Sequence, residues 1–376
     1  MKAGEIFNKQ KQKSRILVAP LDWGLGHATR CIPIIRELLI LDCEVLIAAE
    51  GISKNLLLAE FPGLTFLPII DYGIKYSRKK NLLGIKIFTQ IPRIATIIFN
   101  EHKWLKKVLR DKDIDAVISD NRFGLYHKKI PCIYITHQVN IKTGNFFTDL
   151  LAKKIHGWFI KKYTACWIPD FAEAPGVAGE LSHTAELPVN SHYIGCLSRF
   201  EYIPELTKKY DLLFSLSGPE PQRSIFEKLL INEARHFEGA ILLIRGLPGK
   251  NVDPVEQLDH MEVRDHLTAA QLNEALQSAK FIISRSGYTS IMDYMKLGCK
   301  AILVPTPGQK EQEYLAEIPA TQKLFVTSPQ KKFSLKKLLA EANQTRENLP
   351  VYDMDLYKKT VTEFVDGLRN TVSSNE

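Results

Sequence analysis

The residues best suited to do chemistry lie in one short segment after residue 280. The apolar run at residues 281–284 predicts a buried parallel strand. Ser286 and Gly287 break this strand and open a helix, and Asp293 falls about two turns inside that helix. The free backbone N–H groups at a helix start form an anion site, and a nearby carboxylate can bind the two hydroxyls of a ribose. A phosphate site beside a ribose site predicts that this segment binds a nucleotide.

The segment from residue 281 to residue 318 resembles the donor-binding half of GT-B glycosyltransferases, in particular those of the family 28 type. That family includes the transferase that adds N-acetylglucosamine to the lipid-linked peptidoglycan precursor. Its pattern is Arg-Ser-Gly, a helix with an acidic residue, a strand ending in Val-Pro, and a helix with two Gln before an aromatic residue. Here Asp293 stands where the family usually has Glu, which keeps a carboxylate for the ribose. Glu313 replaces the second Gln, which puts a possible anion at the sugar contact.

The resemblance also assigns residues outside this segment to the same donor. Arg199 matches an arginine that meets the donor diphosphate, and a planar, permanently charged guanidinium suits that group. Ser217 and Gly218 match a small-residue loop after the first strand of the second domain. In full, the residues implied for UDP-sugar binding are Gly24, Gly26, Arg199, Ser217, Gly218, Arg285, Ser286, Gly287, Tyr288, Thr289, Asp293, Gln312 and Glu313.

A second loop with catalytic potential follows the strand predicted at residues 16–20. It contains Gly24, Gly26 and His27, and open α/β sheets bind ligands at the carboxyl ends of their strands. A dinucleotide fingerprint would need a third glycine, and none stands at the required spacing. The Gly-x-Gly-His sequence resembles the Gly-Gly-His loop of GT-B relatives. The alternative is a turn whose histidine only caps a helix.

Asp120 ends another predicted strand, at a spacing from His27 that is compatible with the fourth strand of the same sheet. The chain resembles inverting GT-B enzymes in which an acid later in the same domain orients a loop histidine. This implies that His27 is the general base and Asp120 its partner. A carboxylate at Nδ1 fixes the tautomer and leaves Nε2 to accept a proton. Asp is also a favoured helix N-cap, so a capping role for Asp120 stays open.

His137 and Gln138 follow the strand predicted at residues 132–136. They resemble the His-Glu-Gln-Asn loop of the peptidoglycan relatives, which implies contact with the acceptor. A loop that only packs is the alternative.

Strands and helices alternate along the whole chain, which predicts an α/β fold with parallel sheets. The resemblance implies the GT-B form of this fold, with two Rossmann-like domains facing a cleft. The expected parts are an acceptor domain at 1–196, a linker at 197–209, a nucleotide-sugar domain at 210–350, and a C-terminal helix and tail at 351–376. The expected strands are 16–20, 44–49, 64–69, 116–119, 132–136, 165–168, 193–195, 211–216, 240–244, 281–284, 301–305 and 323–326. By the same resemblance, the terminal helix crosses back onto the first domain.

The composition is that of an ordinary soluble protein with two domain cores, with 376 residues, 45% hydrophobic and 24% charged. Its six cysteines are scattered without a CxxC pair, so we expect buried reduced thiols in a cytosolic protein and no zinc site. The net charge is +8, but no nucleic-acid module is recognisable. Phosphate-bearing substrates and an anionic membrane surface are the partners that this charge favours.

An Asp-x-Asp sequence at Asp111 and Asp113 could suggest a metal clamp. It precedes a predicted strand, at the wrong end of the sheet for a ligand, so we expect a solvated turn. The sequence therefore predicts no metal and no cofactor, and the UDP-sugar is expected as a substrate.

No apolar run is long enough for a transmembrane helix or a signal peptide, which predicts a cytoplasmic protein. Residues 82–104 mix apolar with basic side chains, and Arg78, Lys79 and Lys80 precede them. This pattern suits an amphipathic segment on the inner face of the cytoplasmic membrane. A core helix with a basic edge is the alternative.

We therefore expect an inverting glycosyltransferase that moves a sugar, N-acetylglucosamine or a related hexose, from a UDP-sugar to a lipid-linked or lipopolysaccharide-type acceptor. One alternative is an enzyme like the UDP-N-acetylglucosamine 2-epimerases, which share the two-domain plan. This alternative stays open because an epimerase needs acidic groups at the sugar, and Glu313 could be one of them. The other is a non-catalytic UDP-sugar-binding module, which would not need His27 as a base.

Overall fold

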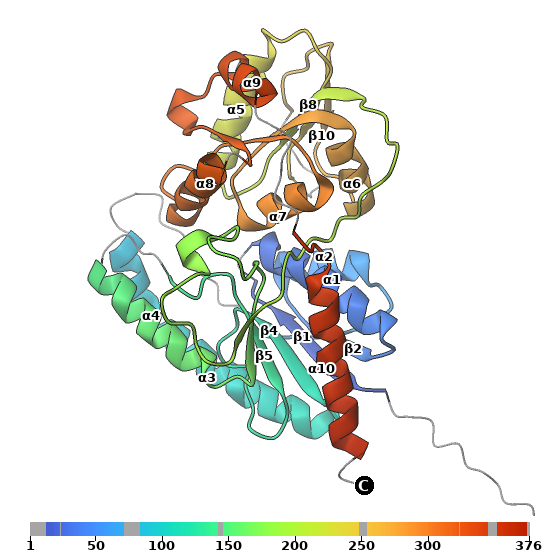
Figure 1. Ribbon diagram of the computed structural model, residues 1–376, viewed down its shortest axis with the longest axis vertical. Helices are drawn as coiled ribbons and strands as arrows, with labels where there is room; N and C mark the ends of the chain where they lie inside the picture. The colour runs from blue at the N-terminus through green and yellow to red at the C-terminus, as the bar shows by residue number, and fades with distance from the viewer. Residues whose placement is uncertain are drawn as a thin grey trace, which may run out of the picture.

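The computed structural model describes residues 13–22, 24–70, 83–141, 146–247, 254–322, 324–344 and 352–373. Two sheets with helices packed around them lie one above the other in Figure 1. The strand order is β3-β2-β1-β4-β5-β6-β7 in the first sheet and β10-β9-β8-β11-β12-β13 in the second. All of these strand pairs are parallel. This is the α/β arrangement that the sequence predicts.

The first sheet forms around central strands that are short apolar runs buried on both faces, and its two edge strands are more exposed. Its elements and their helices are β1 (Arg15–Pro20), α1 (Leu25–Ile40), β2 (Glu44–Ala48), α2 (Gly51–Glu60), β3 (Thr65–Leu67), α3 (Leu83–Asp111), β4 (Ala116–Asp120), β5 (Cys132–Ile135), α4 (Phe146–Ile160), β6 (Ala165–Ile168) and β7 (Ser191–Tyr193). In β1, Ile16 and Val18 enter the apolar cluster on one face, and Leu17 and Ala19 enter the cluster on the other. Successive side chains of a strand point to opposite faces, so a continuous apolar run suits this position.

The second sheet is built in the same way. Its elements and the helices after it are β8 (Tyr210–Ser215), α5 (Gln222–Ala234), β9 (Ile241–Ile244), β10 (Met261–Arg264), α6 (Ala269–Gln277), β11 (Ala279–Ser284), α7 (Tyr288–Leu297), β12 (Ala301–Leu303), α8 (Lys310–Gln322), β13 (Val326–Thr327), α9 (Leu335–Gln344) and α10 (Leu356–Ser373). Apolar clusters again lie on both faces of the strands.

Three strands differ from the sequence prediction. The edge strand β10 was not expected, because two of its four residues are charged and exposed. The strand expected at 193–195 is instead β7, at Ser191–Tyr193. Gly195 has a φ of 75°, outside the extended region, and its N–H donates to the Asp170 carbonyl at 3.0 Å. β13 begins at Val326, and Lys323, where it was expected to begin, lies outside the described residues.

The last helix, α10, returns from the second sheet to the first, as the resemblance implies. Its residues Tyr357, Val361, Val365 and Leu368 are buried in an apolar cluster of the first sheet. In Figure 1 it is the long red helix beside the lower sheet. The helix therefore ties the end of the chain to its beginning.

Three smaller expectations can be checked against the structure. All six cysteines are buried and free, and the turn from Asp111 to Asp113 is exposed. Within the described residues, no helix is long and apolar enough to cross a membrane.

Candidate active site

The start of α1 lies against the start of α7, so the first turn of a helix from one sheet meets that of the other. Gly24, with a φ of 86°, turns the chain from β1 into α1. A Cβ on Gly26 would lie 3.1 Å from the hydroxyl oxygen of Thr289, and that hydroxyl lies 3.5 Å from the Gly26 carbonyl oxygen. Gly287 is the N-cap residue of α7. The predicted catalytic loop and the predicted donor loop are therefore in contact.

Asp120 lies beside the loop that leads into α1, because β1 and β4 are neighbours and Pro20 pairs with Asp120. Its Oδ1 is 3.0 Å from Nδ1 of His27. Arg30 donates from Nε to Oδ2 and from Nη2 to Oδ1, each at 2.6 Å. The Asp120 carboxylate thus bonds two side chains of α1 rather than the backbone N–H groups of a helix start.

The protonation of this pair follows from burial and charge. Burial raises the pKa of the Asp120 carboxyl, but Arg30 and His27 outweigh burial and lower the pKa to about 2. Burial lowers the pKa of His27, against the influence of Asp120 and with that of Arg30. At neutral pH the pair is therefore a carboxylate beside a neutral imidazole, and only a neutral imidazole can accept a proton.

His137, after β5, connects the first sheet to the helices of the second. Its Nδ1 is 3.0 Å from Nη1 of Arg30, and its Nε2 is 2.8 Å from Oε1 of Glu311. Its ring stacks on Tyr288, with centroids 4.1 Å apart and 7° between the planes. The amide nitrogen of Gln138 lies 3.3 Å from the same Nε2. The two predicted acceptor residues therefore lie beside the predicted base.

Asp293, on α7, is the residue predicted to bind the ribose. It is buried, and the Ser198 hydroxyl donates to its Oδ1 at 2.6 Å. Burial raises its pKa to about 7, although Ser198 and Arg199 act in the opposite direction. Nε of Arg199 is buried and has no hydrogen-bond partner among the described residues. The structure therefore brings the predicted ribose and diphosphate residues together.

The Arg285 side chain does not face this region. It is 1% exposed, and its guanidinium donates to the carbonyl oxygens of Gln222, Val304 and Pro305. It also lies over the Phe226 ring, and burial lowers its pKa to about 10. Arg285 thus joins the ends of β11 and β12 to α5, and its guanidinium contacts scaffold groups.

Gln312 and Glu313 also use their side chains locally. The amide oxygen of Gln312 accepts from the Thr306 N–H at 2.9 Å. One carboxylate oxygen of Glu313 accepts from the Gly308 N–H at 2.8 Å, and the other from Lys310 at 2.9 Å. These contacts shape the loop before α8. The remaining predicted donor residues are Ser286, whose hydroxyl donates to the Gln312 carbonyl at 2.8 Å, and Ser217 and Gly218, which are exposed after β8.

Two residues at the centre of the site, Arg30 and Glu311, were not selected from the sequence. Arg30 stands three positions after His27, and residues three apart share one face of a helix. That spacing was the available signal. Glu311 is one of several polar residues at the start of α8, and no pattern indicates which of them turns toward the other sheet.

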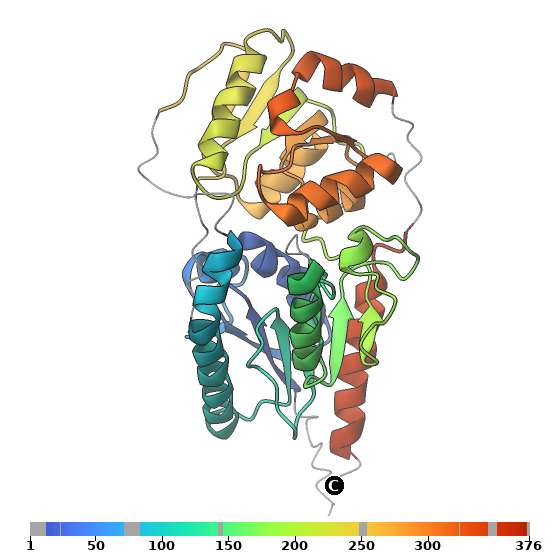
Figure 2. The same ribbon diagram turned by 90° about the vertical axis from the view of Figure 1, so that its left-hand side faces the viewer.

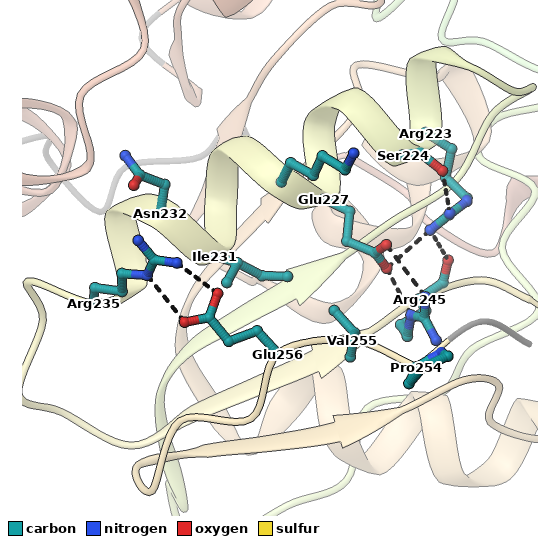
Figure 3. A pocket seen from close by; sticks show the side chains of 11 residues that line it. Arg223, Ser224, Glu227, Ile231, Asn232, Arg235, Arg245, Pro254, Val255 and Glu256 are labelled. Carbon is teal, nitrogen blue, oxygen red and sulfur yellow. Dashed lines mark hydrogen bonds and ion pairs between the residues drawn. The ribbon is translucent and has the colours of Figure 1, made fainter.

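A cavity of about 580 Å³ lies elsewhere, beside α5 (Figure 3). Glu227 is bonded there by Arg223 at 3.0 Å and by Arg245 at 2.7 Å. Arg235 and Glu256 form a second ion pair at 2.7 Å. These charges are paired with one another, and the exposed Lys228 also lines the cavity. Within the described residues, no group of three His, Cys, Asp or Glu side chains is placed to hold a metal ion.

Comparison with known proteins identifies the class of enzyme. Residues 234–365 match the model of the glycosyltransferase family 28 C-terminal domain. An uncharacterized glycosyltransferase of Methanosarcina mazei is 22% identical over 324 residues, which are 81% of this chain and 83% of that protein. The UDP-N-acetylglucosamine--N-acetylmuramyl-(pentapeptide) pyrophosphoryl-undecaprenol N-acetylglucosamine transferase of Shouchella clausii is 23% identical over 358 residues, 93% of each chain. The structure of the glycosyltransferase SnogD from Streptomyces nogalater has a TM-score of 0.67, at 14% identity, over 95% of this chain and 100% of that chain.

The two-sheet fold and its structural likeness define a protein of the GT-B class. The matched domain and the curated relatives identify it further, as a glycosyltransferase that resembles the family 28 type. It is therefore a transferase, which sets aside a non-catalytic sugar-binding module.

Proposed function

We propose that the protein transfers a sugar, with inversion, from a UDP-sugar to a lipid-linked or lipopolysaccharide-type acceptor. The observation that carries this proposal is the contact between His27 and the buried Asp120, 3.0 Å apart, at the edge of the sheet that meets the donor loop. A sugar hydroxyl is a poor nucleophile until a base removes its proton, and a general base accelerates such a step by about 10²–10⁴.

In the proposed reaction, Nε2 of His27 accepts the proton of the acceptor hydroxyl. The hydroxyl oxygen forms a bond to the anomeric carbon as the bond from that carbon to the diphosphate oxygen breaks. UDP leaves with the electron pair, and attack from the opposite side inverts the configuration. Asp120 stabilises the imidazolium that forms, provided that Nδ1 of His27 carries a proton directed at Asp120.

For the donor, we propose that Asp293 binds the ribose hydroxyls and that Arg199 and the N-terminus of α7 bind the diphosphate. The unpartnered Nε of Arg199 and the buried carboxyl of Asp293 support this assignment. A helix N-terminus and an arginine can stabilise a departing diphosphate without a metal ion. UDP-N-acetylglucosamine is the first donor to test, because it is the donor in the name of the Shouchella clausii relative.

An epimerase-like reaction is less well supported than transfer. That alternative depended on an acidic Glu313 at the sugar, and the Glu313 carboxylate instead contacts Gly308 and Lys310.

We further propose that the enzyme is peripheral on the inner face of the cytoplasmic membrane, docked by α3 and α4. Figure 2 shows both helices on the side turned to the viewer. On α4, Leu151, Ile155 and Trp158 are 48%, 49% and 57% exposed at helical spacing. On α3, Phe99 is 58% exposed, with Lys103 over its ring. The side chains of residues 83–91 and residues 78–82, which were part of the sequence prediction, lie outside the described residues.

The described part of α3 has features of both structures considered from the sequence, a membrane-surface helix and a core helix with a basic edge. Ile97 and Leu105 are buried, as in a core helix, whereas Lys106, Lys107 and Arg110 are exposed. In the turn just after α4, the cation Lys162 lies 3.5 Å from the Trp158 ring centroid. An apolar surface with adjacent cations suits an anionic lipid surface.

The test is a panel of nucleotide sugars, assayed first by thermal shift and then for release of UDP with and without lipid-linked acceptors. Acceptor-dependent release of UDP from one donor supports the proposed transfer. Conversion of the donor sugar to its 2-epimer without an acceptor would support the epimerase instead.

A further inference from the structure

Arg30 lies at the centre of the candidate site, although the proposed reaction gives it no role. Its guanidinium is 3% exposed and contacts three side chains. Nε and Nη2 donate to Asp120, Nη2 lies 2.6 Å from Nδ1 of His27, and Nη1 lies 3.0 Å from Nδ1 of His137. An arginine side chain has only donors and stays charged. Any ring nitrogen that it contacts this closely must therefore act as an acceptor.

This requirement fixes the tautomer of His137. Its Nδ1 accepts from Arg30, so in the neutral ring the proton is on Nε2. Nε2 then donates to Glu311, whose Oε1 is 2.8 Å away, and the Gln138 amide, whose nitrogen lies 3.3 Å from Nε2, must turn its oxygen toward that proton. Glu311 remains a carboxylate, because the contact with His137 outweighs burial and lowers its pKa. His137 is thus a neutral bridge from Arg30 to α8, and both of its nitrogens are occupied.

At His27, Arg30 and Asp120 compete for the same ring nitrogen, Nδ1. Its Nδ1 lies 2.6 Å from Nη2 of Arg30 and 3.0 Å from Oδ1 of Asp120. With a proton, Nδ1 can donate to Asp120, but two donors would then face each other across 2.6 Å. Without a proton, Nδ1 accepts from Arg30 at 2.6 Å, the proton is on Nε2, and two acceptors, Nδ1 and Oδ1 of Asp120, face each other at the longer distance of 3.0 Å. Only the first tautomer leaves Nε2 free to act as the base.

We propose that Arg30 is a positioning residue that holds His27 in the Nε2–H tautomer while its Nη2 contacts Nδ1, so that the base is idle until Arg30 leaves Nδ1. The proposal rests on the proposed role of His27 as the base. The groups that surround the His27 ring are Asp120, Arg30, His137 and, beyond His137, Glu311. Because Glu311 belongs to α8, the second sheet helps to hold Arg30 in this position through His137.

The test reads the tautomers directly and needs no substrate. The full chain is labelled with ¹⁵N-histidine, and two-bond ¹H–¹⁵N correlation spectra at pH 8 distinguish protonated from unprotonated ring nitrogens. His27→Gln and His137→Gln assign the signals. In the wild type, both rings should carry their proton on Nε2. In Arg30→Gln, His27 should change to the Nδ1–H form, and His137 should lose its single tautomer.

Arg36→Gln is the control, since Arg36 lies on the same helix but bonds Glu60 and the Arg199 carbonyl. It should leave both tautomers unchanged. A wild-type His27 with its proton on Nδ1 would overturn the proposal, as would an Arg30→Gln spectrum with His27 still in the Nε2–H form. If Arg30→Gln does not fold, the wild-type spectrum and Arg30→Lys, which keeps the charge but shortens the contact, decide the question. Failure of the proposed transfer would appear separately, as absence of UDP release in the donor panel.

Discussion

Asp120 and Asp293 are both buried carboxyl groups, but their neighbours give them different protonation states. Two short bonds from Arg30 help to lower the pKa of Asp120 to about 2. Asp293 has the Ser198 hydroxyl and a more distant Arg199, and burial raises its pKa to about 7. At neutral pH, Asp120 is therefore charged, whereas Asp293 is close to its titration.

The titration of Asp293 predicts how UDP binding depends on pH. A carboxylate can accept from both ribose hydroxyls, so affinity for UDP should increase as the pH rises through about 7. Asp293→Ala should weaken binding by about 1.5–3 kcal/mol and remove this pH dependence. Titration calorimetry at pH 6 and pH 8 measures both effects. Asp211→Asn, at a partly exposed carboxyl paired with Lys280, is the control, and wild-type affinity in Asp293→Ala would exclude Asp293 from the site.

Residues of the candidate site that lie at strand ends were easier to select from the sequence than residues that lie on helices. His27 and Asp120 could be predicted because each follows a recognisable apolar strand. Arg30 and Glu311 could not, because their roles depend on which neighbour reaches them in space. Arg285 matches its motif, yet its side chain contacts backbone carbonyls, and the sequence holds no sign of that orientation.

At the scale of elements, the close approach of α1 and α7 depends on the absence of a side chain at Gly26. Overpacking costs about 1–3 kcal/mol. Gly26→Val should therefore push the starts of α1 and α7 apart and lower turnover about tenfold. Replacing Thr289 by Ala removes the nearest atom and should restore part of the loss. Gly63→Ala, where no atom lies within 4 Å, is the control. Full turnover in Gly26→Val would show that the two helix starts need not meet.

The exposed surface of α3 and α4 predicts binding to anionic lipid. Each basic residue near such a surface contributes about 1 kcal/mol at low salt. Replacing Lys103, Lys106 and Lys107 by Gln should therefore weaken binding to anionic vesicles, and Trp158→Ser should weaken it further. Vesicle sedimentation at two salt concentrations measures this. Val189→Ser, at an exposed apolar residue elsewhere, should have no effect, and equal binding of all variants would exclude this surface.

Most elements could be predicted because their apolar runs are continuous and bounded by glycine or polar turns. Two strands, β10 and β7, are exceptions. β10 lies at a sheet edge, where charged side chains interrupt the apolar pattern. β7 ends early because Gly195 turns the chain toward Asp170. Both depend on contacts that are distant in the sequence.

At the scale of the whole molecule, the two halves touch through side chains of several elements. Besides the contact of His137 with Glu311, the Tyr288 hydroxyl donates to the Pro169 carbonyl. The hydroxyl of Tyr314 accepts from the Glu180 N–H at 2.8 Å. The sequence resemblance predicted two halves facing each other, but it could not predict these contacts, because each joins residues far apart in the chain.

We also predict that turnover needs no metal ion. In the proposed reaction, Arg199 and the start of α7 stabilise the departing diphosphate. EDTA should therefore leave the rate of UDP release unchanged. Loss of activity with EDTA, restored by Mg²⁺ or Mn²⁺, would contradict this part of the proposal.

The most direct test of the central proposal is the turnover of His27→Ala, with UDP affinity measured on the same preparation. The variant should lower kcat by about 10²–10⁴, because the general base is lost. Its affinity for UDP should be that of the wild type, because the proposed donor residues Asp293 and Arg199 are unchanged. Asp120→Asn should give a smaller loss of the same kind. Full turnover in His27→Ala would contradict the proposal and show that the base lies elsewhere.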